Sequence, residues 1–318
     1  MRFYEEANNI MNEINNVLIG KKDKVEFAMM ALLAGGHLLL EDVPGVGKTS
    51  LANAMAKTMD VSFSRIQFTP DTLPSDVTGI SVYNMKNATF EFQKGAIMHS
   101  IILADEINRT SPKTQSSLLE AMEERQVTVD GIIYPIEAPF MVIATQNPME
   151  FTGTYNLPEA QLDRFLMRIS IGYPTVEDEI LMALNYLKEE PIKKVKTVAN
   201  KELICELQNE VRSVDIHKDL ITYIVNLISE TRVHESLSLG ASPRATLGLI
   251  RASKACAYLS GRDFVIPDDV KKVIYPVLNH RLVLSMEAKI NKVALDEVIK
   301  SIIRKVRVPI LTGDFYGA

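Results

Sequence analysis

The segment from Glu41 to Thr49 has the residue types of a loop that binds phosphate groups. It runs Glu-Asp-Val-Pro-Gly-Val-Gly-Lys-Thr, directly after an apolar segment and directly before a helical pattern. Its two glycines allow backbone N–H groups to turn toward phosphate oxygens, which the start of the following helix also attracts. A plain glycine turn between a strand and a helix is the alternative. We predict a nucleotide-binding loop whose contacts come from Asp42, Pro44, Gly45, Val46, Gly47, Lys48, Thr49 and Ser50.

Two residues at the end of this loop have distinct tasks. Lys48 would reach the β- and γ-phosphate oxygens, and the hydroxyl of Thr49 would ligate Mg²⁺. The common pattern has glycine six residues before the lysine, where this chain has Asp42. Because the Pro-Gly-Val-Gly-Lys-Thr core is intact, we retain ATP and Mg²⁺ as the expected ligands.

A pair of acids closes the apolar run that begins at Ser100. Asp105 and Glu106 would lie at the carboxyl edge of a parallel sheet, where such folds place their ligand chemistry. Asp105 would hold the Mg²⁺ shell, and Glu106 would orient or deprotonate the attacking water. A solvated turn at the end of a strand is the alternative. With the phosphate loop upstream, we interpret both acids as catalytic-site residues.

Asn147 and Arg164 flank the next two apolar runs. Asn147 follows Phe140–Thr145, so its amide would position water beside the γ-phosphate, although Asn-Pro alone is only a turn signal. Arg164 precedes Phe165–Ile171, at the rim of the domain, where it would reach the nucleotide of a neighbouring subunit. An arginine finger of this kind raises the rate by ~10³–10⁵. A surface Asp-Arg pair is the alternative for Arg164.

Three further arginines are candidates for phosphate or interface contacts. Arg244 lies in the first turn of a predicted helix, where a positive charge opposes the helix dipole, so we assign it to a nucleotide phosphate. Arg109 and Arg281 could face a subunit interface, but our preferred interpretation of each is a solvated arginine.

The elements that must position these residues alternate between apolar strands and helices. Strands that are apolar on both faces, with helices between them, indicate a parallel sheet covered on both sides. Two segments rich in β-branched and aromatic residues, 82–92 and 127–136, predict added hairpins. The five predicted strands are 37–40, 64–68, 100–105, 140–145 and 165–171.

After Pro174 the pattern is helical throughout. Helices are predicted over 177–188, 201–212, 218–233, 243–259, 267–278 and 294–306, with a linker over 188–200. We therefore predict an α/β nucleotide-binding domain over residues 1–190 and a smaller all-α domain over 191–318.

Composition restricts the class of protein. The chain has 318 residues and a formal net charge of −5, which argues against a protein that coats nucleic acid. Cys205 and Cys256 have no metal-ligand spacing and are expected to be buried free thiols. The N-terminus lacks a signal peptide, and the longest apolar run, 27–40, is too short for a membrane span. A soluble cytoplasmic protein is the expectation.

In this order, the motifs resemble those of the MoxR family of AAA+ ATPases. The resemblance extends from about Ile10 to Val308 and includes Asp42 of the phosphate loop. It identifies Asn147 as sensor 1, Arg164 as the arginine finger and Arg244 as the sensor 2 arginine. The matching segments are 40–49 for Walker A, 104–109 for Walker B, 144–148 for sensor 1, 157–165 for the finger and 242–245 for sensor 2, with 68–71 and 73–79 as further family sequence.

The resemblance implies a ring, usually a hexamer, that hydrolyses ATP between subunits. It further implies chaperone-like remodelling, maturation or metal-cofactor insertion of partner proteins, often beside a protein with a von Willebrand A domain. The two predicted hairpins would be the family's helix-2 insert and pre-sensor-1 hairpin. Ile19 and Gly20 would lie near the adenine, and Arg244 could serve the chain's own site or a neighbour's.

Two other functions remain open from the sequence. The first is the motor subunit of a chelatase or of a nucleic-acid machine, although the chain has no zinc-finger spacing, helix-turn-helix signature or basic tail. The second is an ATP-bound regulatory scaffold with low turnover. Lys48, Glu106 and Arg164 argue against the scaffold, because a protein that does not hydrolyse ATP has no need of a glutamate that orients water.

Overall fold

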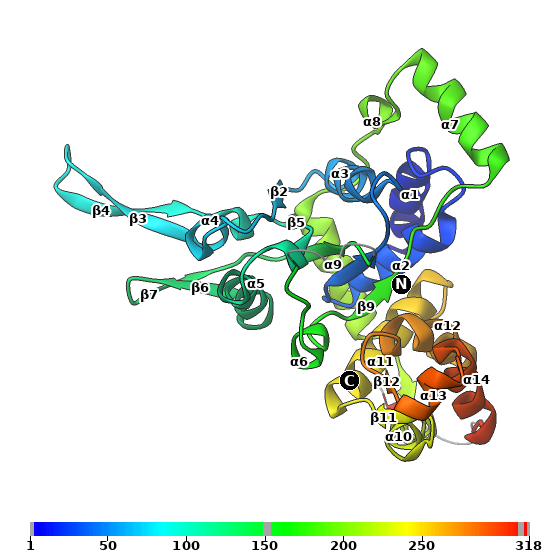
Figure 1. The fold of residues 1–318 in the computed structure, drawn as a ribbon. Helices are drawn as coiled ribbons and strands as arrows, with labels where there is room; N and C mark the ends of the chain where they lie inside the picture. The colour runs from blue at the N-terminus through cyan, green and yellow to red at the C-terminus, as the bar shows by residue number, and fades with distance from the viewer. Residues whose placement is uncertain (1–2, 149–153, 311–314, 317–318) are drawn as a thin grey trace.

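A computed structural model describes residues 3–148, 154–310 and 315–316, and its centre is a five-stranded sheet (Figure 1). The spatial order is β2-β5-β8-β1-β9, and each neighbouring pair is parallel. The strands are β1 (Leu38–Glu41), β2 (Phe63–Gln67), β5 (Ile101–Asp105), β8 (Met141–Gln146) and β9 (Met167–Ile169). The sheet confirms the predicted α/β class and all five predicted strands.

Two apolar layers bury the sheet, one on each face. Leu38, Leu103 and Ile143 pack into the larger cluster, with α1 (Tyr4–Asn15), α2 (Lys22–Leu33) and α3 (Lys48–Thr58). Leu39 and Ala144, which alternate with them along the strands, pack into the smaller cluster with α5 (Pro112–Glu124). Burial on both faces explains why these strands have continuous apolar runs rather than an alternating pattern.

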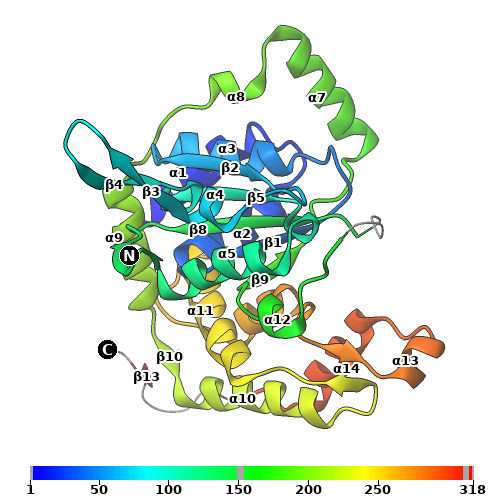
Figure 2. The same ribbon diagram turned by 60° about the vertical axis from the view of Figure 1, so that its left-hand side comes forward.

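Both predicted hairpins are present and extend away from the body on the same side (Figures 1 and 2). One comprises β3 (Gly79–Asn84) and β4 (Thr89–Lys94), and the other β6 (Gln126–Val129) and β7 (Ile132–Pro135). The rings of Phe92 and Tyr134 stack at a centroid distance of 3.9 Å and join the two hairpins. Short helical segments lie between these elements: α4 (Pro74–Thr78), η1 (Ala96–Met98), η2 (Ile107–Arg109) and α6 (Glu159–Leu162).

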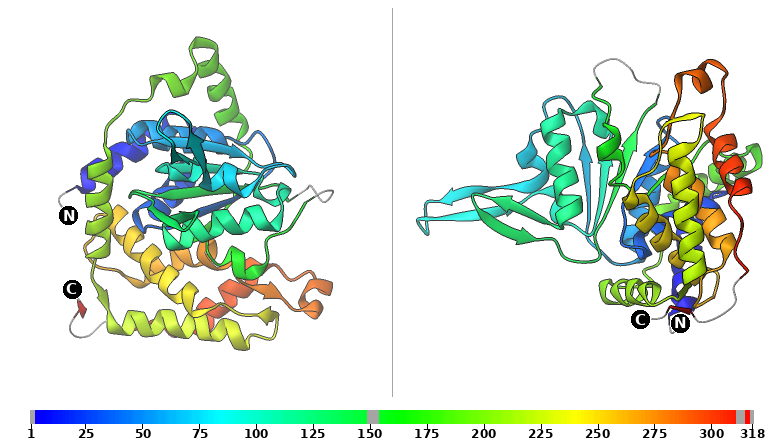
Figure 3. Two further views of the ribbon diagram at one scale, coloured as in Figure 1. Left: turned by 90° about the vertical axis from the view of Figure 1, so that its left-hand side faces the viewer. Right: turned by 90° about the horizontal axis from the view of Figure 1, so that it is seen from below.

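The C-terminal part is mostly helical and packs beside the sheet domain (Figure 3). The prediction of no strands there was incomplete, because β11 (Leu237–Leu239) pairs with β12 (Val283–Leu284) and β10 (Ile216–His217) with β13 (Phe315–Tyr316). Strands of two or three residues are too short to show a periodic pattern. The helices are α8 (Pro191–Lys194), α9 (Lys201–Arg212), α10 (Lys218–Val233), α11 (Pro243–Leu259), α12 (Pro267–Leu278), α13 (Met286–Ile290) and α14 (Leu295–Lys305).

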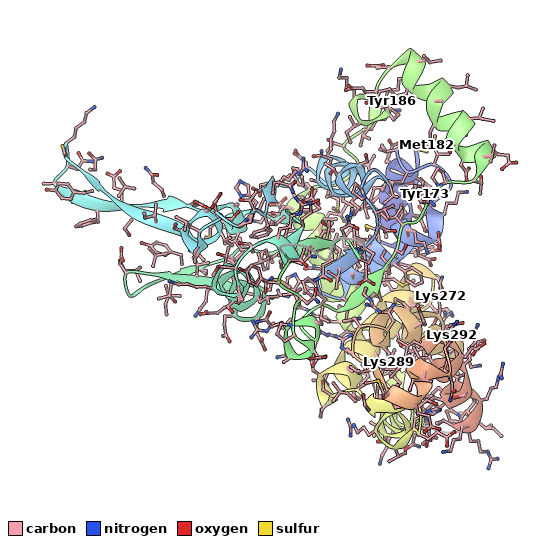
Figure 4. All side chains as sticks on the ribbon, in the orientation of Figure 1. Tyr173, Met182, Tyr186, Lys272, Lys289 and Lys292 are labelled. Carbon is pink, nitrogen blue, oxygen red and sulfur yellow. The ribbon has the colours of Figure 1, made fainter. Side chains whose placement is uncertain are left out.

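Helix α7 (Val176–Lys188) links the two parts and stands away from the body (Figure 1). Its apolar side chains are largely exposed, with Leu187 at 84% and Tyr186 at 64%. Figure 4 shows Met182 and Tyr186 on the side of this helix that faces α1 and α3 in that view, and Tyr173 on the segment before the helix. The boundary between domains near residue 190 remains a prediction, because α9 packs against α2 of the sheet domain as well as against α11.

Two expectations about the chain as a whole can be compared with the structure. Cys205 and Cys256 are both free thiols, as predicted, but only Cys256 is buried, whereas Cys205 is partly exposed. Among the described residues, no helix has the length and apolar character required to cross a bilayer.

Candidate active site

The loop between β1 and α3 has the backbone that phosphate binding requires. Gly45 and Gly47 have φ values of +87° and +97°, in the left-handed region that favours glycine. A Cβ atom at either position would meet no other atom within 4 Å, so the loop borders open space on this side. Helix α3 begins at Lys48, and its first N–H groups have no partner within the helix. The start of α3 therefore presents backbone N–H groups that can bind an anion.

Asp42 was predicted to contact the nucleotide, but its carboxylate binds protein atoms instead. Its carboxylate accepts hydrogen bonds from Ser170 Oγ (2.7 Å), Ile171 N (2.6 Å) and Gly172 N (3.1 Å), and the residue is buried. Its carbonyl oxygen accepts one from Lys48 Nζ at 2.9 Å. The side chain thus fixes the end of β9, and any effect of Asp42 on a nucleotide would be through the shape of the loop.

The two acids lie opposite the loop across a cavity of about 360 Å³. Asp105 accepts a hydrogen bond from Thr145 Oγ1 (2.7 Å), and the same hydroxyl oxygen accepts one from Glu106 N (2.9 Å). Glu106 has a φ of +57°, a strained conformation for glutamate that turns the chain at the strand end. The cavity lining comprises Pro44, Gly45, Gly47, Lys48, Thr49, Ser50, Arg65, Gln67, Asp105 and Glu106.

The donor set in this cavity fits Mg²⁺. The Thr49 hydroxyl and the Asp105 carboxylate provide the hard oxygen ligands that this ion prefers, and the remaining positions are open to water and phosphate oxygens. Mg²⁺ commonly takes one or two protein oxygens and completes its shell in this way. Both predicted metal ligands are therefore brought together.

Arg65 and Gln67 belong to this site, although sequence reasoning did not find them. Arg65 Nη2 donates to Asp105 Oδ2 at 2.6 Å and to Gln67 Oε1 at 2.8 Å. Gln67 Nε2 donates to Glu106 Oε2 at 2.8 Å, and Arg109 Nε lies 3.2 Å from the same oxygen. Their spacing of two along β2 was the available signal, because it places both side chains on one face of a strand that ends level with Asp105.

A second cavity, of about 240 Å³, adjoins the loop on the side away from the acids. Ile19 and Val46 line it, together with Tyr173, Glu179 and Met182 from the start of the α7 region. Gly20 has a φ of +73° and lies against the carboxylate of Asp178. The predicted adenine residue Ile19 thus lines a cavity beside the phosphate loop, and Gly20 follows it in the chain. Sequence reasoning missed Tyr173, which precedes the predicted helix 177–188, and Met182, which lies within it.

Asn147 is close to the acids in the fold. It is buried and directly follows β8, the strand between β5 and β1, so it lies between the loop and the two acids at the same edge of the sheet. This is the placement expected of a residue that senses the γ-phosphate.

Arg164 and Arg244 lie at the opposite edge of the sheet. Arg164 precedes β9, and Arg244 is in the first turn of α11. Both contact Glu123, near the end of α5, with Arg164 Nε at 3.1 Å from Glu123 Oε2 and Arg244 Nη2 paired with Glu123 Oε1. With Gly36, Arg125, Arg251 and other residues they line a cavity of about 230 Å³.

The cavity that Arg164 and Arg244 line is strongly basic. Desolvation, together with neighbouring Arg125 and Arg244, lowers the pKa of Arg251, and desolvation and Arg212 lower that of Arg125. Like charges lower these pKa values because each disfavours the charged form of the next. A protein with a formal net charge of −5 thus concentrates positive charge at this edge.

The interpretation of Arg281 as a solvated arginine was wrong. Arg281 is buried, and its guanidinium donates to Asp163 Oδ1 (2.6 Å), Phe165 O (2.6 Å) and Leu166 O (3.1 Å). It joins the end of α12 to the segment before β9. Arg109 is partly exposed, but it contacts Glu106 rather than only solvent.

Comparison with known proteins agrees with this geometry. Residues 37–167 match the family described as "ATPase family associated with various cellular activities (AAA)", and residues 229–302 match the "AAA lid domain". The "Uncharacterized protein YeaC" of Bacillus subtilis is 50% identical, over 94% of both chains. "Chaperone MoxR1" of Mycobacterium tuberculosis is 40% identical, over 93% of this chain and 81% of its own.

A crystal structure has the same fold over almost the whole chain. It is described as a putative ATPase from Cytophaga hutchinsonii, has a TM-score of 0.91 and 40% identity, and the match covers 97% of this chain and 96% of that one. This chain therefore shares an AAA domain and a lid domain with known proteins. Its sequence identity to these relatives, 40% or more, indicates a shared family as well as a shared fold. The chain belongs to the MoxR family of AAA+ ATPases.

Proposed function

We propose that this chain hydrolyses ATP at the interfaces of a ring, usually a hexamer in the family, in which each site combines residues of two copies. The observation that carries this proposal is the separation of the two cationic groups. Lys48 lies at the carboxyl edge of the sheet, whereas Arg164 and Arg244 lie at its amino edge. A strand of five residues such as β5 spans roughly 15 Å. One chain therefore does not bring both groups to one phosphate, but a second copy can.

In this proposal the carboxyl edge binds the nucleotide. Lys48, released from the Asp42 carbonyl, would pair with the β- and γ-phosphates, while the N–H groups of the loop bind their oxygens. The base would occupy the cavity of Ile19, Tyr173 and Met182. Thr49 and Asp105 would hold Mg²⁺, which when bound neutralises charge on the phosphates.

Glu106 would then act on water. Gln67 and Arg109 fix its carboxylate oxygen Oε2, which leaves Oε1 as an acceptor for a water proton. Asn147 would align the same water without adding charge. Arg164 and Arg244 of the adjacent copy would stabilise the charge that develops on the transferred phosphoryl group.

ATP turnover of this kind would drive chaperone-like remodelling, maturation or metal-cofactor insertion of partner proteins. A relative at 40% identity is named a chaperone, which supports the first of these. We further propose a partner with a von Willebrand A domain. The low-turnover scaffold is disfavoured, because Gln67 and Arg109 hold Glu106 at the cavity, and a protein that does not hydrolyse ATP has no need of a glutamate that orients water.

The Glu106→Gln variant tests hydrolysis directly. The amide keeps the size of the side chain but does not accept a proton, so kcat should fall by about 10²–10⁴ while ATP binding is retained. Steady-state phosphate release and binding of a fluorescent ATP analogue measure the two quantities. If wild type and variant release phosphate at the same negligible rate while both bind ATP, the chain is a scaffold.

A further inference from the structure

Glu123 is the carboxylate that joins the two arginines at the amino edge. It lies one residue before the end of α5, and each of its oxygens contacts one guanidinium: Oε2 contacts Arg164 Nε at 3.1 Å, and Oε1 contacts Arg244 Nη2. No motif in the sequence indicated a role for this residue. Its position between the two arginines means that they are held side by side.

The geometry leaves donors available on both arginines. A guanidinium has five N–H donors, and the contact of Arg164 is through Nε, the nitrogen nearest the chain. The outer nitrogens of Arg164 can therefore still bind a phosphate oxygen. About a third of the Glu123 side chain is exposed, at 33%, so the group faces the open cavity rather than the core.

Electrostatics explain why a carboxylate is needed here. Arg125 and Arg251 line the same cavity, and the lowered pKa of Arg251 reflects Arg125 and Arg244 in addition to desolvation. Arg164 and Arg244 contact the two oxygens of one carboxylate, and without that anion their positive charges would repel each other. The two acids that line the cavity, Glu123 and Asp163, do not balance its five arginines, so a more highly charged anion such as a triphosphate remains attracted.

The backbones that carry the two arginines are also linked. Ser242, the residue that precedes α11, donates its hydroxyl proton to Asp163 Oδ2 at 2.7 Å. Asp163 is adjacent to Arg164, and Ser242 is two residues before Arg244. This side-chain bond joins the segment before β9 to the start of α11, and Glu123 contacts the side chains of both arginines.

We propose that Glu123 is a positioning residue that holds Arg164 and Arg244 as one clamp for the terminal phosphate of ATP bound to a second copy of this chain. This inference rests on the proposed function and deepens it. Without Glu123 the clamp opens and the two guanidiniums no longer approach one phosphate together. Because misplacement by about 1 Å can reduce a rate by about 10², the effect should fall on kcat.

Mixed rings test the proposal. A Lys48→Ala subunit, which does not hold ATP, can donate its arginines, and an Arg164→Ala subunit can accept them at its own ATP. The mixture should regain activity that neither variant has alone. Glu123→Gln is then added to the donor in one mixture and to the acceptor in another. Glu124→Gln, an exposed neighbour on the same helix with the same change of charge, is the control in each.

We expect Glu123→Gln in the donor to lower the restored kcat by about ten- to a hundredfold, with KM for ATP unchanged, and the same change in the acceptor to have less than a twofold effect. Equal losses in both placements would indicate a structural role and overturn the proposal. So would no loss in either, or a gain, which would mean that Glu123 restrains the arginines. If donor and acceptor regain no activity at all, catalysis between subunits fails and this inference fails with it.

Discussion

The two edges of the central sheet have opposite chemistry. At the carboxyl edge, acids and a single buried lysine surround a cavity whose glycine loop has open space beside it. At the amino edge, Arg125, Arg164, Arg244 and Arg251 share a cavity with few acids. The first edge can hold a metal–nucleotide complex but has few cations for the transition state. The second has an excess of cations and no phosphate loop.

The two edges also differ in how firmly their charged groups are held. At the carboxyl edge Arg65, which contacts Asp105, is about half exposed at 47%, so the pair can exchange with an ion. At the amino edge Arg281 is 3% exposed in its side chain and bonds to Asp163 and main-chain carbonyls. We infer that the binding half adapts to its ligand, whereas the main chain on either side of Arg164 is prepared in advance by Arg281.

The sharpest way to break this comparison is to remove the finger. Arg164→Ala should lower kcat by about 10³–10⁵, because the charge on the transferred phosphoryl group loses its guanidinium. ATP affinity of the dissociated subunit should remain that of wild type, since Arg164 is at the far edge. Single-turnover phosphate release and fluorescent-nucleotide binding measure the two. A large loss of ATP affinity in the dissociated subunit would show that Arg164 acts on its own site.

The rigid character of the amino edge is tested by Arg281→Met. The methionine keeps an apolar stem but leaves Asp163 without its cation, and breaking such a buried pair costs about 3–5 kcal/mol of the free energy of unfolding. Urea denaturation followed by circular dichroism gives this value. A loss below about 1 kcal/mol, the range of exposed ion pairs, would contradict the prepared arrangement.

Much of the carboxyl edge could be predicted because its residues are contiguous. Strand, loop and helix follow one another around Lys48, and Asp105 and Glu106 end a single apolar run. The sheet follows from the same continuous runs. The spacing of apolar residues that predicts helices and strands is a local property of the chain.

The contacts that could not be predicted are between residues that are far apart in the sequence. Glu123 and Arg244 are far apart in the sequence yet paired in the fold, and Arg281 is buried against a segment more than a hundred residues earlier. A single arginine has no local signal of its distant partners, so we interpreted Arg281 as solvated although apolar residues flank it. Asp42 likewise shows its task only when β9 lies beside it.

His37 provides a pH test of the amino edge. Burial lowers its pKa from 6.5 to about 4, and its Nδ1 accepts a hydrogen bond from Val142 N at 3.0 Å, which requires a neutral ring. The unfolded chain therefore binds a proton that the folded chain does not, and stability present above pH 6.5 is lost as the pH falls toward 4. The loss approaches about 3 kcal/mol.

His37→Gln should flatten this part of the pH dependence, measured as the free energy of unfolding at intervals between pH 7 and pH 4. Burial also lowers the pKa of His280, so the stability of the variant is still expected to depend on pH. The contribution of His37 is therefore the difference between the curves of wild type and variant. Parallel curves for the two proteins would show that folding does not lower the pKa of His37.

The smallest expected effect concerns Arg65 at the carboxyl edge. Its guanidinium lies 2.6 Å from Asp105 Oδ2, so Mg²⁺ bound by this carboxylate would compete with it. A half-exposed pair contributes up to about 1 kcal/mol, and Arg65→Met should therefore lower the half-saturating Mg²⁺ concentration by up to about fivefold. Magnesium titrations of fluorescent-ATP binding measure this, with Arg307→Met, at an exposed position, as the control for lost charge. A higher Mg²⁺ requirement would instead mean that Arg65 helps to orient Asp105 for the metal, and that this edge too is prepared in advance.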